Sequence, residues 1–296
     1  VRRSGRPHVV NVRFTGWSLP GGTGEHFNDS GGRPLDPPLL AMSSFSHSQF
    51  GGGKFTVSAG SGFGASSGSV ALTNCLWERV YVTLSDDVSD PRWYLFNNLF
   101  YGGTLSRSTS EGNPALWAYN NLFDGTTNTG SAPSACDYNG YVTNYSRLTT
   151  GANDVILTNR PVYQTSWLGR YYYPTNDGML NLLINAGSCN ATNAGLYHFT
   201  TTTNQVKETT STVDIGFHYV AVNGIGQPVD TDGDGLPDYL EDANGNGVYD
   251  TGDLTDFNAW DTDGDGLPDG IDAEPTVYDH SAPAFTITSP SEGSVF

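Results

Sequence analysis

The chain has 296 residues, with 31 acidic and 13 basic side chains and a formal net charge of −18. Of the acidic residues, 15 lie between Asp230 and Glu274, where Lys and Arg are absent, so the charge belongs mainly to one segment. The sequence contains no transmembrane run, and we expect neither membrane insertion nor a nucleic-acid partner.

Residues 1–225 are rich in Gly, Ser, Thr, Asn and Tyr, and they lack a sustained helical period of 3.6 residues. This pattern predicts a region that is nearly all β. Three hexapeptides align without gaps: LTNCLW, LFNNLF and AYNNLF, which begin at Leu72, Leu95 and Ala118. They repeat at an interval of 23 residues. A unit of this length with Gly-rich corners must stack on copies of itself to bury its apolar face.

Parallel stacking places each residue over its counterpart in the next coil, at a spacing of about 4.8 Å. We therefore expect Leu76, Leu99 and Leu122 to form one interior stripe. The repeated asparagines are expected to form a hydrogen-bonded ladder at a turn: Asn74, Asn97 and Asn120. Segments such as Leu180–Gly187 would form further coils. The predicted fold is a right-handed parallel β-helix over residues 1–225, with coils assigned from Val70 onward.

A resemblance supports this architecture. The stretch LLINAGSCNATNAGLYHF and the later STVDIGFHY (Ser211–Tyr219) resemble the closing coils of large secreted β-helix proteins from bacteria of the Planctomycetes and Verrucomicrobia type. Those proteins are pectin-lyase-like, and Ser211–Tyr219 resembles their last strand. The resemblance implies a secreted protein that works outside the cell or on its surface. It implies little about chemistry, because most such proteins have no assigned activity.

Many pectin-lyase-like proteins cleave polysaccharides, either as lyases or as hydrolases. A polygalacturonase-like hydrolase would carry Gly-His-Gly and Arg-Ile-Lys elements, and the chain has neither. A calcium-dependent lyase needs an Arg or Lys base, but Arg79, Arg92 and Arg107 fit better as solvated surface residues. We therefore predict no catalytic residue, and we keep an enzyme as the alternative.

Two further residue types leave their roles open. His218 follows Asp214 by four residues, and on a strand the two would share a face, where a structural hydrogen bond is the commoner outcome. The 16 Tyr and six Trp residues could line a sugar-binding groove or fill a β-helix interior. Polysaccharide is therefore kept as a candidate partner.

The three cysteines form no C-x-x-C pattern. Cys75 occupies the register of Asn98 and Asn121, so we expect a buried or turn-lining free thiol there. A disulfide between Cys136 and Cys189 is left open, since exported proteins can form one.

The acidic segment begins with DTDGDGLPDYLE at Asp230. Its spacing fits the calcium-loop pattern D-x-[DN]-x-[DN]-G-x5-E, once fully and twice with Asp at the last position. We name the three matches loop 1 (Asp230–Glu241), loop 2 (Asp242–Asp253) and loop 3 (Asp261–Asp272). The predicted metal ligands are Asp230, Asp232, Asp234, Leu236, Asp238, Glu241, Asp242, Asn244, Asn246, Val248, Asp250, Asp253, Asp261, Asp263, Asp265, Leu267, Asp269 and Asp272, where Leu236, Val248 and Leu267 would offer backbone carbonyls.

Calcium is the expected ion because it takes six to eight hard oxygen ligands at roughly 2.3–2.6 Å. About three Ca²⁺ ions would offset the repulsion among the carboxylates, so we expect order in calcium and disorder in chelator. The chain leaves no room for long helices beside the loops. The repeated Asp-Gly frame and Leu-Pro-Asp tripeptide resemble the thrombospondin type-3 calcium repeat, and the resemblance implies a connector whose core is calcium.

The last residues, SAPAFTITSPSEGSVF, resemble the opening strand of a bacterial immunoglobulin-like domain, but they are too few to form one. Residues 276–296 are therefore expected to begin such a domain or to form an extended arm that pairs with another copy. The predicted all-β fold has three parts: the β-helix (1–225), the calcium-binding loop segment (226–275) and the terminal strand (276–296).

The sequence thus favours an extracellular, calcium-stabilised structural or adhesive protein, with copies of itself joined head to tail in a filament. A polysaccharide lyase or hydrolase is one alternative. A glycan-binding module without catalysis is another.

Overall fold

The computed structural model describes residues 8–10, 13–15, 41–59, 68–86, 92–109, 115–130, 132–143 and 145–279. The chain divides into two compact units. The first unit comprises Val1–Gln227 with Gly245–Gly247, and the second comprises Pro228–Asn244 with Val248–Phe296. In the described ranges, none of the helices combines the length and the apolar character needed to cross a membrane.

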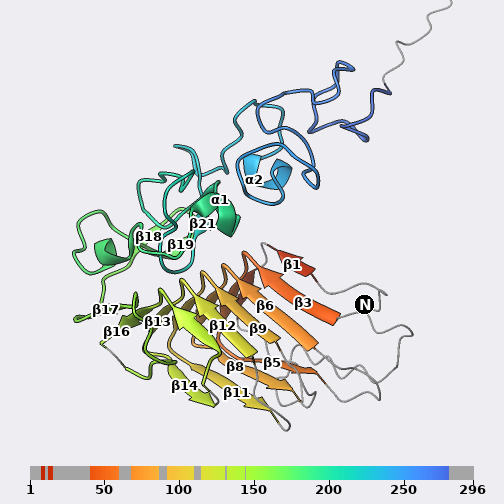
Figure 1. The fold of residues 1–296 in the computed structure, drawn as a ribbon. Coiled ribbons are helices and arrows are strands. Elements are labelled where there is room, and N and C mark those ends of the chain that lie inside the picture. The colour runs from red at the N-terminus through yellow and green to blue at the C-terminus, as the bar shows by residue number, and fades with distance from the viewer. Residues whose placement is uncertain are drawn as a thin grey trace, which may run out of the picture. The chain divides into compact units, whose positions relative to one another are not determined.

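Three parallel sheets form most of the first unit, and their strands lie side by side in Figure 1. Sheet A contains β1 (His8–Val10), β3 (Ala41–Ser46), β6 (Gly68–Thr73), β9 (Arg92–Phe96), β12 (Ala115–Tyr119) and β15 (Ala135–Asp137). Sheet B contains β2 (Arg13–Thr15), β4 (Gln49–Gly51), β7 (Leu76–Glu78), β10 (Leu99–Tyr101), β13 (Leu122–Asp124), β16 (Gly140–Val142) and β17 (Val155–Leu157). Sheet C contains β5 (Lys54–Ala59), β8 (Tyr81–Asp86), β11 (Thr104–Thr109) and β14 (Thr127–Gly130).

The remaining elements are short. Two pairs of strands are antiparallel: β18 (Gln164–Ser166) with β19 (Gly169–Tyr172), and β20 (Phe199–Thr200) with β21 (Tyr219–Val220). The helices are η1 (Leu180–Leu183), α1 (Ala191–Ala194) and α2 (Asp238–Glu241). The fold is therefore all-β with parallel sheets.

The strands visit the three sheets in turn, so that β6, β7 and β8 are followed by β9, β10 and β11 in the same order. The register repeats the sequence interval. Leu99 pairs with Leu76 on one side and with Leu122 on the other, as the aligned hexapeptides predict. The alignment of these three leucines is therefore confirmed.

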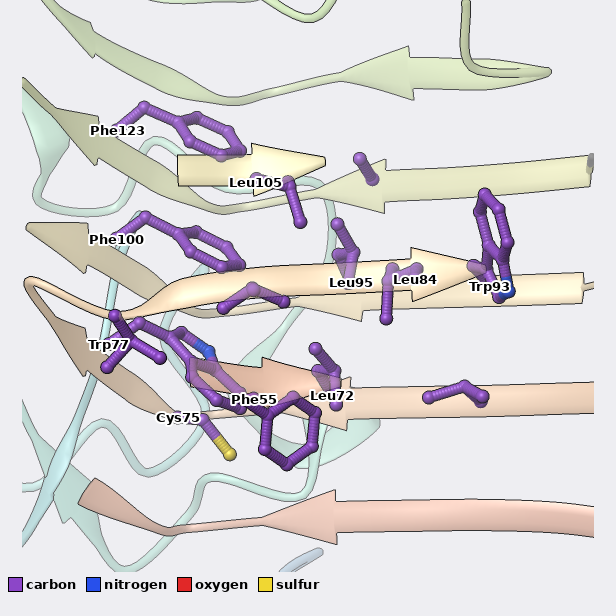
Figure 2. Packing of buried hydrophobic residues seen from close by; sticks show 14 of the residues in the cluster. Phe55, Leu72, Cys75, Trp77, Leu84, Trp93, Leu95, Phe100, Leu105 and Phe123 are labelled. Atoms are coloured by element: carbon purple, nitrogen blue, oxygen red, sulfur yellow. The ribbon is translucent and has the colours of Figure 1, made fainter. Parts of the chain in front are cut away.

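The interior between the sheets is filled by a column of aromatic rings from sheet B, of which Trp77, Phe100 and Phe123 are visible in Figure 2. The Phe50 and Trp77 rings stack with centroids 4.2 Å apart and planes 2° apart. Trp77 to Phe100 is 6.0 Å, Phe100 to Phe123 is 5.1 Å, and Phe123 to Tyr141 is 5.2 Å. The parallel register places each ring over the next, so the column follows directly from the repeat.

The leucine stripe lies on the opposite face of sheet B from this column. Leu76, Leu99 and Leu122 belong to a second buried cluster, together with Tyr173 and Ile215. The prediction that the stripe is interior to the coils was wrong, because neighbouring residues on a strand point to opposite faces and the aromatic neighbours occupy the interior. The leucines are instead covered by residues that follow β17.

An asparagine ladder joins the coils at the turn between sheets A and B. The backbone N–H of Cys75 donates to Asn98 Oδ1 at 3.0 Å, and that of Asn98 donates to Asn121 Oδ1 at 3.1 Å. The backbone N–H of Asn121 donates to Asn139 Oδ1 at 3.0 Å. The Asn139 amide donates in turn to Asp154 Oδ1 at 3.0 Å. Asn98, Asn121, Asn139 and Asp154 thus each accept a backbone N–H from the preceding coil through a side-chain oxygen.

The ladder is displaced by one residue from the predicted positions. Asn74, Asn97 and Asn120 adopt φ of +49°, +56° and +60°, a conformation that asparagine tolerates better than most residues. Their side chains reach residues far along the chain. The Asn74 amide group exchanges two hydrogen bonds with the His218 backbone, at 2.7 and 2.9 Å. These asparagines therefore attach later residues to the turn, and their neighbours form the ladder.

Replacing Asn121 by leucine is expected to lower the free energy of unfolding of the first unit by about 3 kcal/mol. The backbone N–H of Asn98 would lose its acceptor, and the carbonyls of Leu95 and Tyr119 would lose a donor. Urea unfolding followed by tryptophan fluorescence measures the change. The exposed Asn176→Ala variant is the control and should change stability by less than about 0.5 kcal/mol. Equal stability of the two variants would contradict the ladder.

Two segments expected to be coils differ from that prediction. Leu180–Leu183 forms a 3₁₀ helix, because Asp177 Oδ1 accepts the Met179 and Leu180 amides and turns the chain there. Within Ser211–Tyr219, only Tyr219 belongs to a strand, and that strand pairs antiparallel with β20. In the described residues the parallel sheets end at Leu157.

All three cysteines are free thiols, so the disulfide left open between Cys136 and Cys189 is not formed. Cys75 is buried, as predicted, and burial raises the pKa of its thiol to about 12. The thiol lies 3.4 Å from the carbonyl oxygens of Phe45 and Thr73. Its neutral form is therefore the stable one.

The second unit is described from Pro228 to Asp279, apart from Gly245–Gly247, and α2 is its one regular element in that range. Turns and bends make up the rest. The predicted terminal strand (276–296) lies outside the described residues from residue 280 onward.

Candidate metal centre

Loops 1 and 3 share the nonapeptide DTDGDGLPD, which begins at Asp230 and again at Asp261. The repeated sequence produces a repeated backbone. Gly233 and Gly264 both have φ of +79°, and Gly235 and Gly266 have φ of +104° and +100°. A Cβ atom at any of the four would meet nothing within 4 Å, so their conformation, and not space, explains the glycines.

The same hydrogen bonds form in the two loops. The carboxylate at position 1 accepts the amides of positions 4 and 6, as when Gly233 and Gly235 donate to Asp230 at 2.8 and 3.2 Å. In loop 3, Gly264 and Gly266 donate to Asp261 at 2.7 and 2.8 Å. The carboxylates at positions 3 and 5 each accept the amide two residues later: Asp232 from Asp234, Asp234 from Leu236, Asp263 from Asp265, and Asp265 from Leu267. These contacts hold alternate side chains on the inside of each turn.

The threonine at loop position 2 fixes the carboxylate at loop position 9. Thr231 donates through its backbone amide and its hydroxyl to the two oxygens of Asp238, at 2.7 and 2.8 Å. Thr262 does the same for Asp269, at 2.9 and 2.6 Å. The sequence interpretation treated position 9 as a ligand only, and it missed this clamp even though the threonine is part of the repeat. Direct binding of an ion by Asp238 stays a prediction.

The structure brings the predicted ligands together in four groups, each with three ligand atoms within 4.8 Å of one another. Two groups are the first three carboxylates of loops 1 and 3: Asp230, Asp232 and Asp234, and Asp261, Asp263 and Asp265. The third group is Asp234, Glu241 and Asp269, so loop 3 lends a carboxylate to loop 1. The fourth is Asp265, Asp272 and Asp279, and Asp279 lies beyond the loop pattern. Spacing within one loop could not reveal either addition.

Four carboxylate oxygens in these groups are buried without a hydrogen-bond partner. They occupy equivalent places in the two loops: position 3 in Asp232 and Asp263, and position 12 in Glu241 and Asp272. A buried carboxylate oxygen without a donor is costly, and here the cost recurs at the same positions. The residues present therefore fit a cation, since a cation would supply the missing partner.

The electrostatics of the groups point in the same direction. Burial raises the pKa of Glu241 to about 8, with the Asp232, Asp234 and Asp238 charges adding to the effect. Burial, followed by neighbouring carboxylates, also raises the pKa of Asp232 and of Asp263. From Pro228 to Phe296 the sequence has no Lys or Arg to offset these charges. A bound cation would favour the ionised forms.

Loop 2 is arranged differently. Asn244 Nδ2 donates to Asp250 Oδ1 at 2.8 Å, and the Asp250 amide donates to Asp253 Oδ2 at 2.9 Å. Asn246 belongs to the first unit, whereas the loop's other predicted ligands belong to the second. In the residues that the structure describes, no group of three acidic ligand atoms includes this loop. An ion in loop 2, with Asp242 and the Val248 carbonyl as further ligands, stays a prediction.

The clamp at position 2 can be tested by an isosteric change. Replacing Thr231 by valine removes the hydroxyl that donates to Asp238, and it is expected to weaken calcium binding in the second unit at least about tenfold, because a hydrogen bond to a charged group contributes roughly 1.5–3 kcal/mol. Isothermal titration measures the affinity. Thr231→Ser keeps the hydroxyl and should bind as the wild type does, and equal weakening in both variants would exclude the clamp.

The two loops together present inward-turned carboxylates, several of them buried, and this arrangement fits cations. Comparison of the chain with protein-family models, with curated proteins and with solved structures finds no match.

Proposed function

We propose that the chain is an extracellular structural or adhesive protein whose second unit is ordered by about three calcium ions, one in each loop. The observation that carries the proposal is the recurrence of buried carboxylate oxygens without partners at positions 3 and 12 of loops 1 and 3. A chance cluster of surface acids would not repeat the same missing partners at the same loop positions.

Calcium fits this ligand set better than other divalent cations. The groups offer only hard carboxylate oxygens, with no imidazole or thiolate to favour a transition metal. Each loop is a glycine-containing turn with six ligand positions in the calcium-loop pattern, whereas Mg²⁺ demands a near-ideal octahedron and retains its water. The sharing of Asp269 between loops would also make binding at loop 1 depend on the order of loop 3.

The finer fold proposed for the first unit is a right-handed parallel β-helix. The repeated visit to sheets A, B and C, the register of 23 residues and the continuous column of rings support it. The resemblance to secreted pectin-lyase-like proteins and to thrombospondin type-3 repeats supports a place outside the bacterial cell. A filament assembled head to tail through residues 276–296 is part of the proposal.

Two measurements test these statements separately. Isothermal titration of calcium into chelator-treated protein should give about three sites per chain, and no binding at millimolar calcium would overturn the metal assignment. Electron microscopy with calcium and with chelator tests assembly: filaments that depend on calcium are expected, and single particles under both conditions would contradict polymerisation alone.

A second candidate function, glycan binding, is favoured by one specific feature of sheet A. Tyr94 and Trp117 are paired in register on β9 and β12, and their rings stack at 5.0 Å with planes 13° apart. Both are partly exposed, whereas Trp93 and Leu116 on the other face are buried. Flat pairs of this kind offer an apolar face to a pyranose ring.

Affinity electrophoresis in gels that contain neutral polysaccharides tests this candidate. Retardation of the wild type that is lost in Trp117→Ala, but kept in the exposed-residue control Trp167→Ala, is the expected result. No retardation would remove the candidate. Release of unsaturated or reducing-end products from the same polysaccharides would instead favour the lyase or hydrolase alternative.

A further inference from the structure

A second kind of buried polar cluster lies in the first unit, outside loops 1 to 3. Glu208, Asp214 and His218 place one ligand atom each within 4.8 Å of one another, and all three residues are buried. His218 Nε2 lies 3.2 Å from Glu208 Oε1, and the exposed fraction of the His218 side chain is 0%. The sequence interpretation considered Asp214 with His218 but missed Glu208, which no spacing rule connects to them.

The imidazole of His218 is held in one orientation. Its Nδ1 lies 3.0 Å from the Gly216 carbonyl oxygen, to which it donates. The His218 backbone amide donates to Asn74 Oδ1 at 2.7 Å, so the residue is fixed to the turn between sheets A and B. The other nitrogen, Nε2, is buried and makes no well-aligned hydrogen bond. A histidine that ligates a metal has this arrangement, because a carbonyl acceptor on one nitrogen presents the other to the ion.

Both carboxylates are also supported from outside the cluster. Ser211 Oγ donates to Glu208 Oε2 at 2.6 Å, which leaves Oε1 directed to His218. Asp214 Oδ1 accepts the Asn185 amide at 2.7 Å, and Asp214 Oδ2 accepts the Thr201 hydroxyl at 2.5 Å. Each oxygen retains a second lone pair for another partner. These neutral donors orient the buried carboxylates but do not neutralise their negative charges.

With both carboxylates ionised, the charges of the cluster do not balance within it. Two buried carboxylates then face one imidazole, and even a protonated His218 leaves an excess negative charge in a buried site. A divalent cation with a neutral imidazole and two carboxylates would bring the net charge to zero.

We propose that Glu208, Asp214 and His218 form a site for one divalent transition metal ion, with Zn²⁺ as the preferred occupant. Imidazole nitrogen and carboxylate oxygen are normal zinc ligands, and three protein ligands suffice when a fourth position is left for water. Calcium is disfavoured here because it takes oxygen ligands and needs at least six of them. The protein would then hold two classes of metal: calcium in the loops and zinc in the first unit.

The site has a structural consequence for the first unit. Glu208, Asp214 and His218 belong to the segment that covers the leucine stripe of sheet B, and Asn74 and Asn97 attach that segment through the backbones of His218 and Asp214. An ion among these three side chains would cross-link the segment at its attachment points. Because the site is buried, the ion would enter during folding or local opening.

Zinc binding is measured on the full chain after unfolding in urea with chelator and refolding with Zn²⁺ in the presence of saturating calcium. One zinc ion per chain is expected by elemental analysis after gel filtration. His218→Gln and Glu208→Gln should each weaken zinc binding at least tenfold, as loss of a ligand predicts. The double variant Asp232→Asn, Asp263→Asn should lose calcium and keep its zinc.

The contrary reading is a buried ion pair between a protonated His218 and Glu208. Nitrogen NMR of the histidine rings separates the two in the wild type, without any variant. A zinc-dependent shift of Nε2 with Nδ1 protonated is expected. Refolded wild type without zinc, or a doubly protonated His218 ring unchanged by zinc, would overturn the proposal. Zinc binding as tight in His218→Gln and Glu208→Gln as in the wild type would also overturn the proposal.

Discussion

Replacement of Trp77 by alanine is expected to lower the free energy of unfolding of the first unit by about 3–5 kcal/mol, the range for removal of a large aromatic side chain from a packed core. Trp77 is 1% exposed and lies in the aromatic column between Phe50 and Phe100. Its loss would leave a cavity and would interrupt the column that joins the coils. Urea unfolding followed by circular dichroism measures the change.

The control for this variant is Tyr81→Ala in β8, because Tyr81 is 60% exposed and belongs to the same unit. It should change the free energy of unfolding by less than about 0.5 kcal/mol. If Trp77→Ala lowers the free energy of unfolding no more than Tyr81→Ala does, the aromatic column does not form the core.

The second large effect is expected from Asp234→Asn. Asp234 belongs to two of the carboxylate groups, one within loop 1 and one shared with Asp269 of loop 3. Asparagine keeps an acceptor for the Leu236 amide, but it loses the acceptor for the Gly270 amide and removes one charge from both groups. We expect calcium binding to loop 1 to weaken by about 10- to 100-fold, with a smaller loss at loop 3 because the two loops share ligands.

Isothermal titration of Asp234→Asn beside Glu274→Gln gives the comparison. Glu274 is exposed and belongs to none of the carboxylate groups in the described residues, so its variant should bind as the wild type does. Equal affinities for the two variants would mean that loop 1 does not hold the ion, whatever loop 3 does.

The repeat of 23 residues could be predicted from the sequence because parallel stacking aligns identical positions, and Leu76, Leu99 and Leu122 are indeed in register. Which side of the strand faces inward could not be predicted in the same way. In β7, β10 and β13 a leucine is followed directly by an aromatic residue, and both side chains are buried on opposite faces of sheet B. The pattern therefore lacked the polar face that normally identifies the outside.

The sequence also could not predict which asparagine of each pair would join the ladder. Asn97 and Asn98 are chemically identical neighbours, and only the positive φ of Asn97 places Asn98 in the ladder. The sequence gives no signal for that choice. The dipeptide does predict that a buried turn with asparagine oxygens as acceptors lies there.

The carboxylate groups of the second unit were largely predictable because their ligands lie close together along the chain. Alternate positions of a tight turn point inward whatever the rest of the protein does. The contributions of Asp269 to loop 1 and of Asp279 to loop 3 were not predictable, since they depend on how separate turns pack. The cluster of Glu208, Asp214 and His218 is harder still, because irregular backbone brings its members together.

The central claim is that cations hold the turns of loops 1 and 3, and hydrogen exchange of the backbone amides tests it most directly. The relevant amides are those that donate to the inward carboxylates: Gly233, Gly235, Leu236, Gly264, Gly266 and Leu267. In calcium they should exchange at least about 100-fold more slowly than in chelator, while Leu99 and Leu122 of the first unit exchange equally in both. Equal protection of the loop amides with and without calcium would contradict the account.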